Sequence, residues 1–261
     1  MMKLEEQISL MVFNILLEIR TGFDFRKFKN MEYFEEKFDY ANKHLKQLGS
    51  GSARTAFLLS NRFVLKIANQ DNADNKTEES ADKLPSLKGR AQNEAEVDLF
   101  TNPGMKPMVT KIYDNDSLYT WIVAELVRPL SDKEFERTVG VSAAAVERAT
   151  ELMRLNKYNI KDARQYAEKT FRYFEKRAAE NPTGDQYYHK MARNFKESMT
   201  ALGLPFTQSI SELEKEFGVL SSDASEAKHW GKAPDGRVVL LDYGFTQTVA
   251  DEHYSVDKLD F

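Results

Sequence analysis

The feature of this chain that most constrains its fold is a change in the spacing of its apolar residues near residue 128. Before that point, two predicted strand pairs cover 56–67 and 109–127, with turn residues between the members of each pair. Beyond it, helical apolar spacing dominates from 131 to about 217. The sequence therefore predicts an α+β fold of two lobes, a small lobe that contains β-strands and a mainly helical lobe.

This pattern divides the chain into three segments. We expect a helical extension over 1–47, the small lobe over 48–127 and the helical lobe over 128–261. A polar stretch at 70–90 has no periodicity and is expected to be an exposed loop. It is not a linker between domains, because a helical pattern resumes behind it at 91–100.

The longest apolar stretch, Ile8–Ile19, has to be weighed as a membrane segment. About 12 residues are too few to cross a bilayer, and Asn14 and Glu18 interrupt the run. No small-residue cleavage site follows it, so a signal peptide is not expected either. We expect a helix over 3–20 and a second one over 24–47, whose apolar stripe faces the core.

Composition and charge exclude several classes of function. The 37 Lys and Arg residues are outnumbered by 41 Asp and Glu, for a net charge of −4, so no nucleic-acid or membrane partner is expected. There are no cysteines, which excludes disulfides, thiolate zinc sites and a cysteine nucleophile. With four histidines, a centre with several histidine ligands is not expected either.

A glycine-rich turn opens the small lobe. Gly49, Ser50, Gly51 and Ser52 stand where a hairpin turn can bring backbone N–H groups against phosphate oxygens, and a side chain at either glycine would block that approach. The alternative is a Gly-Ser hairpin that serves flexibility alone.

The next strand carries a lysine in an apolar run, Val64-Leu65-Lys66-Ile67-Ala68. An unpaired buried ammonium is costly, so Lys66 calls for an anion or a carboxylate. Glu96 on the following helix is the preferred partner, because Leu99 and Phe100 share its face, and Glu94 is the second choice. The alternative is an ordinary surface lysine and a solvated acidic helix face.

Near the other end, the run Val238-Val239-Leu240-Leu241 delivers an acid and a flexible turn, Asp242-Tyr243-Gly244. An aspartate at the end of such a strand can hold a divalent cation against phosphate oxygens. The motifs along this chain follow the order of the protein-kinase motifs. A glycine-rich turn comes first, then a strand lysine, a helix glutamate and several helices, and finally an acid followed by an aromatic residue and a glycine.

The sequence thus resembles the protein-kinase-like family, and is most similar to the small kinase-like proteins found in bacteriophage genomes. The similarity is carried by four stretches, 49–68, 92–97, 121–130 and 230–246. The resemblance implies that Gly49–Ser52 cover the phosphates of ATP and that Lys66 binds phosphate and pairs with Glu96. It also implies that Asp242 holds Mg²⁺ and that the backbone of Glu125–Val127 meets the adenine edge, the alternative for that stretch being a plain strand end.

The catalytic loop departs from the family, because no His-Arg-Asp triplet is present. The nearest fit makes Asp223, 19 residues before Asp242, the catalytic base that orients the acceptor hydroxyl, and Glu226 is the second choice if Asp223 points away. The place of the metal-binding asparagine falls on Lys228, or on His229 if the loop is one residue longer. His229 is then either a metal ligand or a packing neighbour of Trp230.

A second departure is that 17 residues follow Gly244, too few for an activation segment of the usual kind. The expected fold is therefore kinase-like with no activation segment after Asp242-Tyr243-Gly244. Small-molecule kinases resemble this layout more than protein kinases do.

The sequence leaves several functions open. The first is Mg-ATP-dependent phosphate transfer to an unidentified hydroxyl, with Asp223, Lys66 and Glu96 as catalytic residues. The second is a pseudokinase that binds a nucleotide or a protein partner, and the third is nucleotidyl transfer to a protein substrate. We expect the protein to be cytoplasmic. If the chain is phage-encoded, we expect it in the cytoplasm of the host cell or in the virion.

Overall fold

The computed structural model describes residues 22–70, 84–180 and 186–254. The described residues fall into two compact units. The first lies within Met1–Lys106, Thr110–Val127 and Asp251–Phe261, and the second comprises Pro107–Val109 and Arg128–Ala250. The predicted helix over 3–20 lies outside the described residues, as does most of the predicted loop at 70–90.

The first unit is built on a five-stranded antiparallel sheet with strand order β1-β2-β3-β5-β4. The strands are β1 (Lys46–Ser50), β2 (Arg54–Leu58), β3 (Phe63–Ala68), β4 (Ile112–Asn115) and β5 (Trp121–Glu125). Both predicted strand pairs are present, and the α+β class is confirmed. Strand β1 was not predicted, because its five residues are all exposed and show no apolar alternation.

The described residues include three helices that accompany this sheet, α2 (Phe25–Asn30), α3 (Phe34–His44) and α4 (Leu87–Thr101). The single helix predicted over 24–47 is wrong: Met31 and Leu45 have extended backbones, which end α2 and α3. Helix α4 begins four residues earlier than predicted, because the Ser86 side chain accepts a hydrogen bond from the amide of Gly89 and caps it.

Side chains of helices α2 and α3 share one hydrophobic core with the sheet. Phe57, Leu65 and Val123 are aligned across three strands and join this core, as does the pair Ile67 and Trp121. Rings from α2 meet the Trp121 ring edge-on. The described part of the predicted 1–47 extension is thus packed into the same unit as the sheet.

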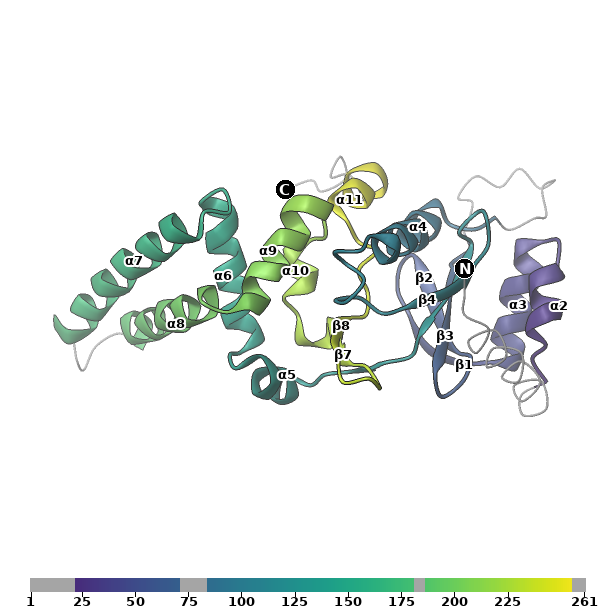
Figure 1. The fold of residues 1–261 in the computed structure, drawn as a ribbon, viewed down its shortest axis with the longest axis horizontal. Coiled ribbons are helices and arrows are strands. Elements are labelled where there is room, and N and C mark those ends of the chain that lie inside the picture. The colour runs from purple at the N-terminus through teal and green to yellow at the C-terminus, as the bar shows by residue number, and fades with distance from the viewer. Residues whose placement is uncertain (1–21, 71–83, 181–185, 255–261) are drawn as a thin grey trace. The chain divides into compact units, whose positions relative to one another are not determined.

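The second unit is mainly helical. Its helices are α5 (Asp132–Val139), α6 (Ala143–Leu155), α7 (Ile160–Glu180), α8 (Gln186–Leu202), α9 (Pro205–Phe217) and the single turn α10 (Ser221–Ala224). Helices α7 and α8 lie side by side as a hairpin (Figure 1). Helix α11 (Gln247–His253) ends the described chain.

A small antiparallel sheet of order β6-β7-β8 completes this unit. It consists of β6 (Arg128–Pro129), β7 (Trp230–Lys232) and β8 (Val238–Leu240), and the predicted turn Pro234-Asp235-Gly236 joins β7 to β8. Gly236 has a φ of 89°, a conformation that favours glycine. The 3₁₀ turn η1 (Ala227–His229) leads from α10 into β7.

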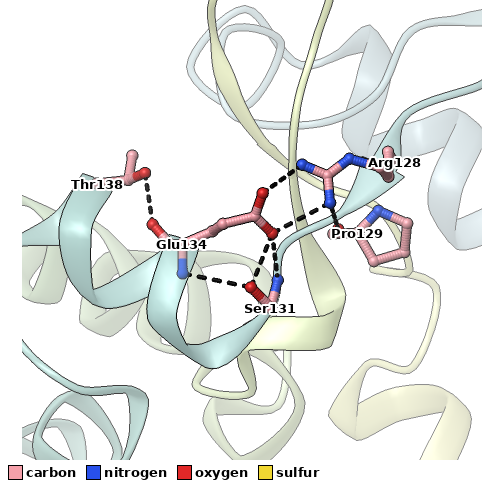
Figure 2. A network of polar contacts seen from close by, with 5 residues as sticks. All are labelled: Arg128, Pro129, Ser131, Glu134 and Thr138. Atoms are coloured by element: carbon pink, nitrogen blue, oxygen red, sulfur yellow. Dashed lines mark hydrogen bonds and ion pairs between the residues drawn. The ribbon is translucent and has the colours of Figure 1, made fainter.

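Helix α5 begins with a reciprocal capping arrangement (Figure 2). The Ser131 hydroxyl accepts from the amide of Glu134, and the Glu134 carboxylate accepts from the amide of Ser131 at 3.0 Å. Arg128 adds a two-pronged ion pair to the same carboxylate, with nitrogen–oxygen distances of 2.5 and 3.1 Å. Together these contacts define how the chain enters the helical unit.

Candidate functional site

A buried ion pair links β3 to α4 in the first unit. The ammonium Nζ of Lys66 lies 2.8 Å from Oε1 and 2.9 Å from Oε2 of Glu96. The Glu96 side chain has no exposed surface, and that of Lys66 is 12% exposed. Glu94, the second choice from sequence, is exposed and does not take this place.

The sheet geometry explains why Lys66 points at α4. Side chains alternate between the two faces of a strand, and Leu65 and Ile67 join the core with α2 and α3. Lys66 therefore lies on the opposite face, against which α4 packs. The strand pattern of the sequence predicts the burial of this segment, and the alternation assigns the lysine to the helix side.

A second cation at this carboxylate was not predicted. The guanidinium of Arg54, on β2, places Nη2 2.8 Å from Oε1 of Glu96, and its side chain is buried. Asn93, one turn before Glu96 on α4, accepts from Nη1 of Arg54 at 3.2 Å and donates to the Tyr119 carbonyl at 2.8 Å. The helical spacing of Asn93 and Glu96 is a signal that could have identified this extension of the network.

Gly89 is a further residue that the sequence analysis missed. A Cβ atom at this position would collide with the carbonyl oxygen of Ala53 and would lie 2.8 Å from Cα of Ala68. The first turn of α4 therefore touches the backbone of the sheet. Any residue larger than glycine at position 89 would force the helix or the sheet backbone to move. This close approach helps to hold α4 where Glu96 meets Lys66.

The glycine-rich segment forms the β1–β2 hairpin. Gly49 and Ser50 end β1, and the amide of Gly51 donates to the Arg54 carbonyl at 2.9 Å. Asn69, just after β3, holds the turn by donating to the Gly51 carbonyl at 2.8 Å, and also accepts from the Thr55 hydroxyl at 2.7 Å. All four residues from Gly49 to Ser52 are exposed.

The two glycines of this hairpin meet no crowding from the described residues. A Cβ atom at Gly49 would have no atom within 4 Å, and one at Gly51 would lie 3.9 Å from the Arg54 carbonyl. Neither has the positive φ that favours glycine. The packing of the described residues gives no reason for glycine at either position.

The predicted hinge follows β5. Glu125 is buried, and its amide donates to the Lys111 carbonyl at 2.8 Å, while the amide of Leu126 donates to the Arg62 carbonyl at 2.8 Å. Among the described residues, none accepts a backbone hydrogen bond from the amide of Val127. Of the three residues in this predicted hinge, Val127 is therefore the one whose amide has no described backbone acceptor.

In the second unit, Asp223 lies on α10, and the residues around it are held by two hydrogen bonds. The ring nitrogen Nδ1 of His229 donates to the Asp223 carbonyl at 2.7 Å, and Nε1 of Trp230 donates to the Ala224 carbonyl at 2.6 Å. A histidine that donates through Nδ1 keeps a lone pair on Nε2, the arrangement usual in metal-binding histidines. His229 is also a direct sequence neighbour of the buried Trp230.

The electrostatic surroundings favour the neutral form of Asp223. Burial raises the pKa of Asp223, and the neighbouring carboxylates of Asp242 and Glu226 raise it further, although His229 and Lys228 oppose the shift. A carboxylate with a raised pKa is a better proton acceptor than an ordinary one. Because Asp242 contributes to the raised pKa of Asp223, the two carboxylates are close enough for their charges to interact.

Two other candidate residues of the predicted catalytic loop, Glu226 and Lys228, lie on the surface. Lys228 and Glu226 are exposed and form an ion pair with a nitrogen–oxygen distance of 2.5 Å. The hydrogen bond from Lys228 lowers the pKa of Glu226, which makes Glu226 a poorer proton acceptor than Asp223. Of these two carboxylates, Asp223 is therefore the better proton acceptor.

Asp242 follows β8 and is exposed, whereas Tyr243 after it is completely buried. The buried ring anchors the segment on which Asp242 is displayed. Among the described residues, no three His, Asp or Glu side chains converge in a way that could hold a metal without other ligands. Mg²⁺ in nucleotide sites commonly uses one or two carboxylates, with water and phosphate oxygens as the remaining ligands.

The predicted site residues thus form two sets. The first unit holds Lys66 and Glu96 together and carries Gly49–Ser52, Glu125 and Val127. The second unit brings together Asp223, His229 and Asp242.

No helix among the described residues is both long and apolar enough to cross a membrane.

No protein-family profile matches the chain, and no curated protein matches it. A solved structure that does match is described as the GDP and kanamycin complex of APH(2")-IIia. The two chains are 11% identical, and the match covers 78% of this chain and 68% of that one with a TM-score of 0.30. A likeness at this TM-score does not establish a shared fold, so the function of the chain has to be argued from its own residues.

Proposed function

We propose that this protein transfers the γ-phosphate of Mg-ATP to a hydroxyl group, as a kinase-like enzyme. The observation that carries the proposal is the buried pair of Lys66 on the third strand and Glu96 on the helix that follows. In protein kinases a lysine on that strand and a glutamate on the next helix form such a pair, and the lysine binds phosphate.

The glycine-rich hairpin supports the same function. The packing of the described residues does not require glycine at 49 or 51, whereas a phosphate that approaches the backbone closely does. In the proposal, Gly49, Ser50, Gly51 and Ser52 cover the phosphates, and Glu125 and Val127 flank the adenine.

The second unit supplies the acids. In the proposal, Asp242 and the free Nε2 of His229 hold Mg²⁺, which would neutralise phosphate charge when bound. Asp223 accepts the proton of the acceptor hydroxyl while the oxygen of that hydroxyl forms a bond to the γ-phosphorus. The bond from that phosphorus to the β–γ bridging oxygen breaks, and ADP leaves with the electron pair.

The test is thermal unfolding of the full chain with and without ATP and Mg²⁺, because a ligand that binds the native state raises its stability by mass action. We expect a rise that needs both ligands and is lost in Asp242→Ala and Lys66→Ala. Asp162→Ala and Lys43→Ala remove exposed residues on α7 and α3 and are the matched controls. No shift at millimolar ATP would overturn the proposal.

A second candidate is a pseudokinase that binds a nucleotide or a protein partner without transferring phosphate. It is favoured by the loop after Asp223, where Lys228 is tied to Glu226 and no asparagine is available for a second metal contact. A nucleotide-dependent rise in stability without any phosphorylated product would support it. Nucleotidyl transfer, the third possibility, would instead add the mass of AMP to a protein substrate.

A further inference from the structure

A cavity of about 570 Å³ lies in the helical unit. None of the residues proposed above to contact nucleotide or metal lines it. Its walls come from α6, α7, α8 and α9, together with the turn α10 and the start of α11. This volume is within the range of about 300–1,000 Å³ that is typical of small-molecule sites.

The cavity touches the reverse face of the turn that carries Asp223. Ser221 and Ser225, four positions apart, line it, and Asp223 does not. Successive helical residues are rotated by about 100°, so Asp223 points away from the side on which the two serines lie. A ligand in the cavity would thus contact α10 from behind, which makes this a site separate from the acceptor position at Asp223.

One acidic side chain of the wall is fastened to α10. The Ser221 hydroxyl donates to Oε1 of Glu214, on α9, at 3.0 Å. Both residues line the cavity, as does Leu220 between α9 and α10. A molecule bound here would contact both ends of the hydrogen bond that joins α9 to α10.

The charge of the walls favours a cation. Three glutamates, Glu147, Glu151 and Glu214, face the cavity with two arginines. Both arginines are already engaged: Arg154 pairs with Glu151, and Arg148 pairs with Glu197 and donates to Ser198. Glu147 is exposed and makes no ion pair with any described residue, so its charge is available to a ligand.

The remaining lining suits an apolar body with a positive end. Leu152, Met191 and Leu220 contribute aliphatic surface, and Tyr166 and Phe195 contribute aromatic rings. Aromatic faces attract ammonium groups as well as apolar groups. We propose that this cavity binds a small amphipathic organic cation, with its ammonium group at Glu147 and its apolar body between α6 and α8.

The test uses two fluorescent probes with the same apolar body and opposite charges. Dansylcadaverine carries an ammonium group, and dansyl-6-aminohexanoate carries a carboxylate at the end of a similar chain. Each is titrated into the full-length protein without nucleotide, and dansyl fluorescence is followed, with excitation through Trp121 and Trp230 as a second readout. We expect saturable binding of the cationic probe, at least about tenfold tighter than that of the anionic one.

Two variants locate the binding. Glu147→Gln should weaken the cationic probe about fivefold, the effect of one unit charge at close range, and should not weaken the anionic probe. Met191→Trp fills the cavity and should weaken both probes, with circular dichroism as the check on folding. Glu136→Gln, an exposed glutamate on α5 outside the cavity, is the matched control and should change neither affinity.

Equal affinity for the two probes, absence of binding, or binding that survives both Glu147→Gln and Met191→Trp would overturn the proposal. The titration contains no ATP, so its result does not depend on the phosphotransfer proposed above. Loss of the nucleotide-dependent shift in stability together with intact probe binding would reject that function and keep this site.

Discussion

The Lys66 ammonium is within 2.9 Å of both oxygens of the Glu96 carboxylate, which has no exposed surface and is also bound by Arg54. Two cations therefore share one buried anion. Loss of Glu96 takes the shared carboxylate away from both cations, whereas loss of Lys66 leaves Glu96 still paired with Arg54. The three residues should contribute unequally to stability.

The first prediction follows from this asymmetry. Glu96→Ala should lower the free energy of unfolding by about 3–5 kcal/mol, the usual cost of breaking a buried ion pair from one side. Lys66→Ala should cost about half as much or less, because Arg54 remains in place. Urea unfolding of both variants measures the difference, and a larger loss for Lys66→Ala would contradict this account of the network.

The second prediction compares two glycines. Gly89→Ala should destabilise the protein by about 1–3 kcal/mol or more, because the new Cβ meets the backbone of Ala53 and Ala68. Gly49→Ala meets open space and should leave the unfolding free energy within about 0.5 kcal/mol of the parent. Chemical denaturation separates the two, and equal effects would show that α4 does not depend on the close approach at Gly89.

Gly49→Ala also bears on the proposed function. If the hairpin covers phosphates, this variant should keep its melting temperature without ligand but lose part of the ATP-dependent rise. An unchanged rise would argue against phosphate contact at Gly49.

The third prediction concerns Asp223. Because burial raises its pKa, folding favours the protonated form, so the contribution of Asp223 to stability is complete below its unfolded pKa and is lost as pH rises through the folded value. Asp223→Asn should therefore be at least as stable as the parent at pH 7, and, if Asp223 is the proton acceptor proposed above, the variant should not transfer phosphate. Destabilisation at pH 7 would indicate that the charged carboxylate has a structural role.

The fourth prediction concerns Glu134, at the start of α5 (Figure 2). The ion-paired hydrogen bond from Arg128, followed by the hydrogen bonds from Ser131, lowers the pKa of Glu134 from 4.5 to about 2. A depressed carboxyl pKa adds stability that is complete above the unfolded value and is lost as pH falls from about 5 to about 2. Part of the acid sensitivity of unfolding should therefore be absent in Glu134→Gln.

Unfolding curves of parent and Glu134→Gln protein between pH 2 and 7 check this, at low and high salt. The difference should shrink at high salt, because the pair is exposed and therefore screened. Identical acid profiles at low salt would contradict the assigned shift. NMR titration of the Glu134 carboxyl carbon gives its pKa directly.

Several parts of this architecture follow from local sequence. The strand pairs around Ser60-Asn61 and Asn115-Asp116 are predicted by apolar runs with turn residues between them, and the long helices of the second unit by their periodicity. The interruption of the 24–47 helix was missed because an apolar stripe can continue through a break in the backbone. Strand β1 was missed because pairing with β2, not apolar alternation, makes it a strand.

The same division applies to the candidate site. An apolar strand with one lysine predicted, without any structure, that Lys66 pairs with an anion or a carboxylate, since an unpaired buried charge is unfavourable, and helical spacing made Glu96 the preferred partner and Glu94 the second choice. Only the tertiary structure decided that the partner is Glu96 and not Glu94, that Arg54 shares it, and that Gly89 allows α4 to lie so close. Strand and helix patterns repeat over a few residues, whereas these contacts join positions more than 20 residues apart, and packing selects among the side chains that could make them.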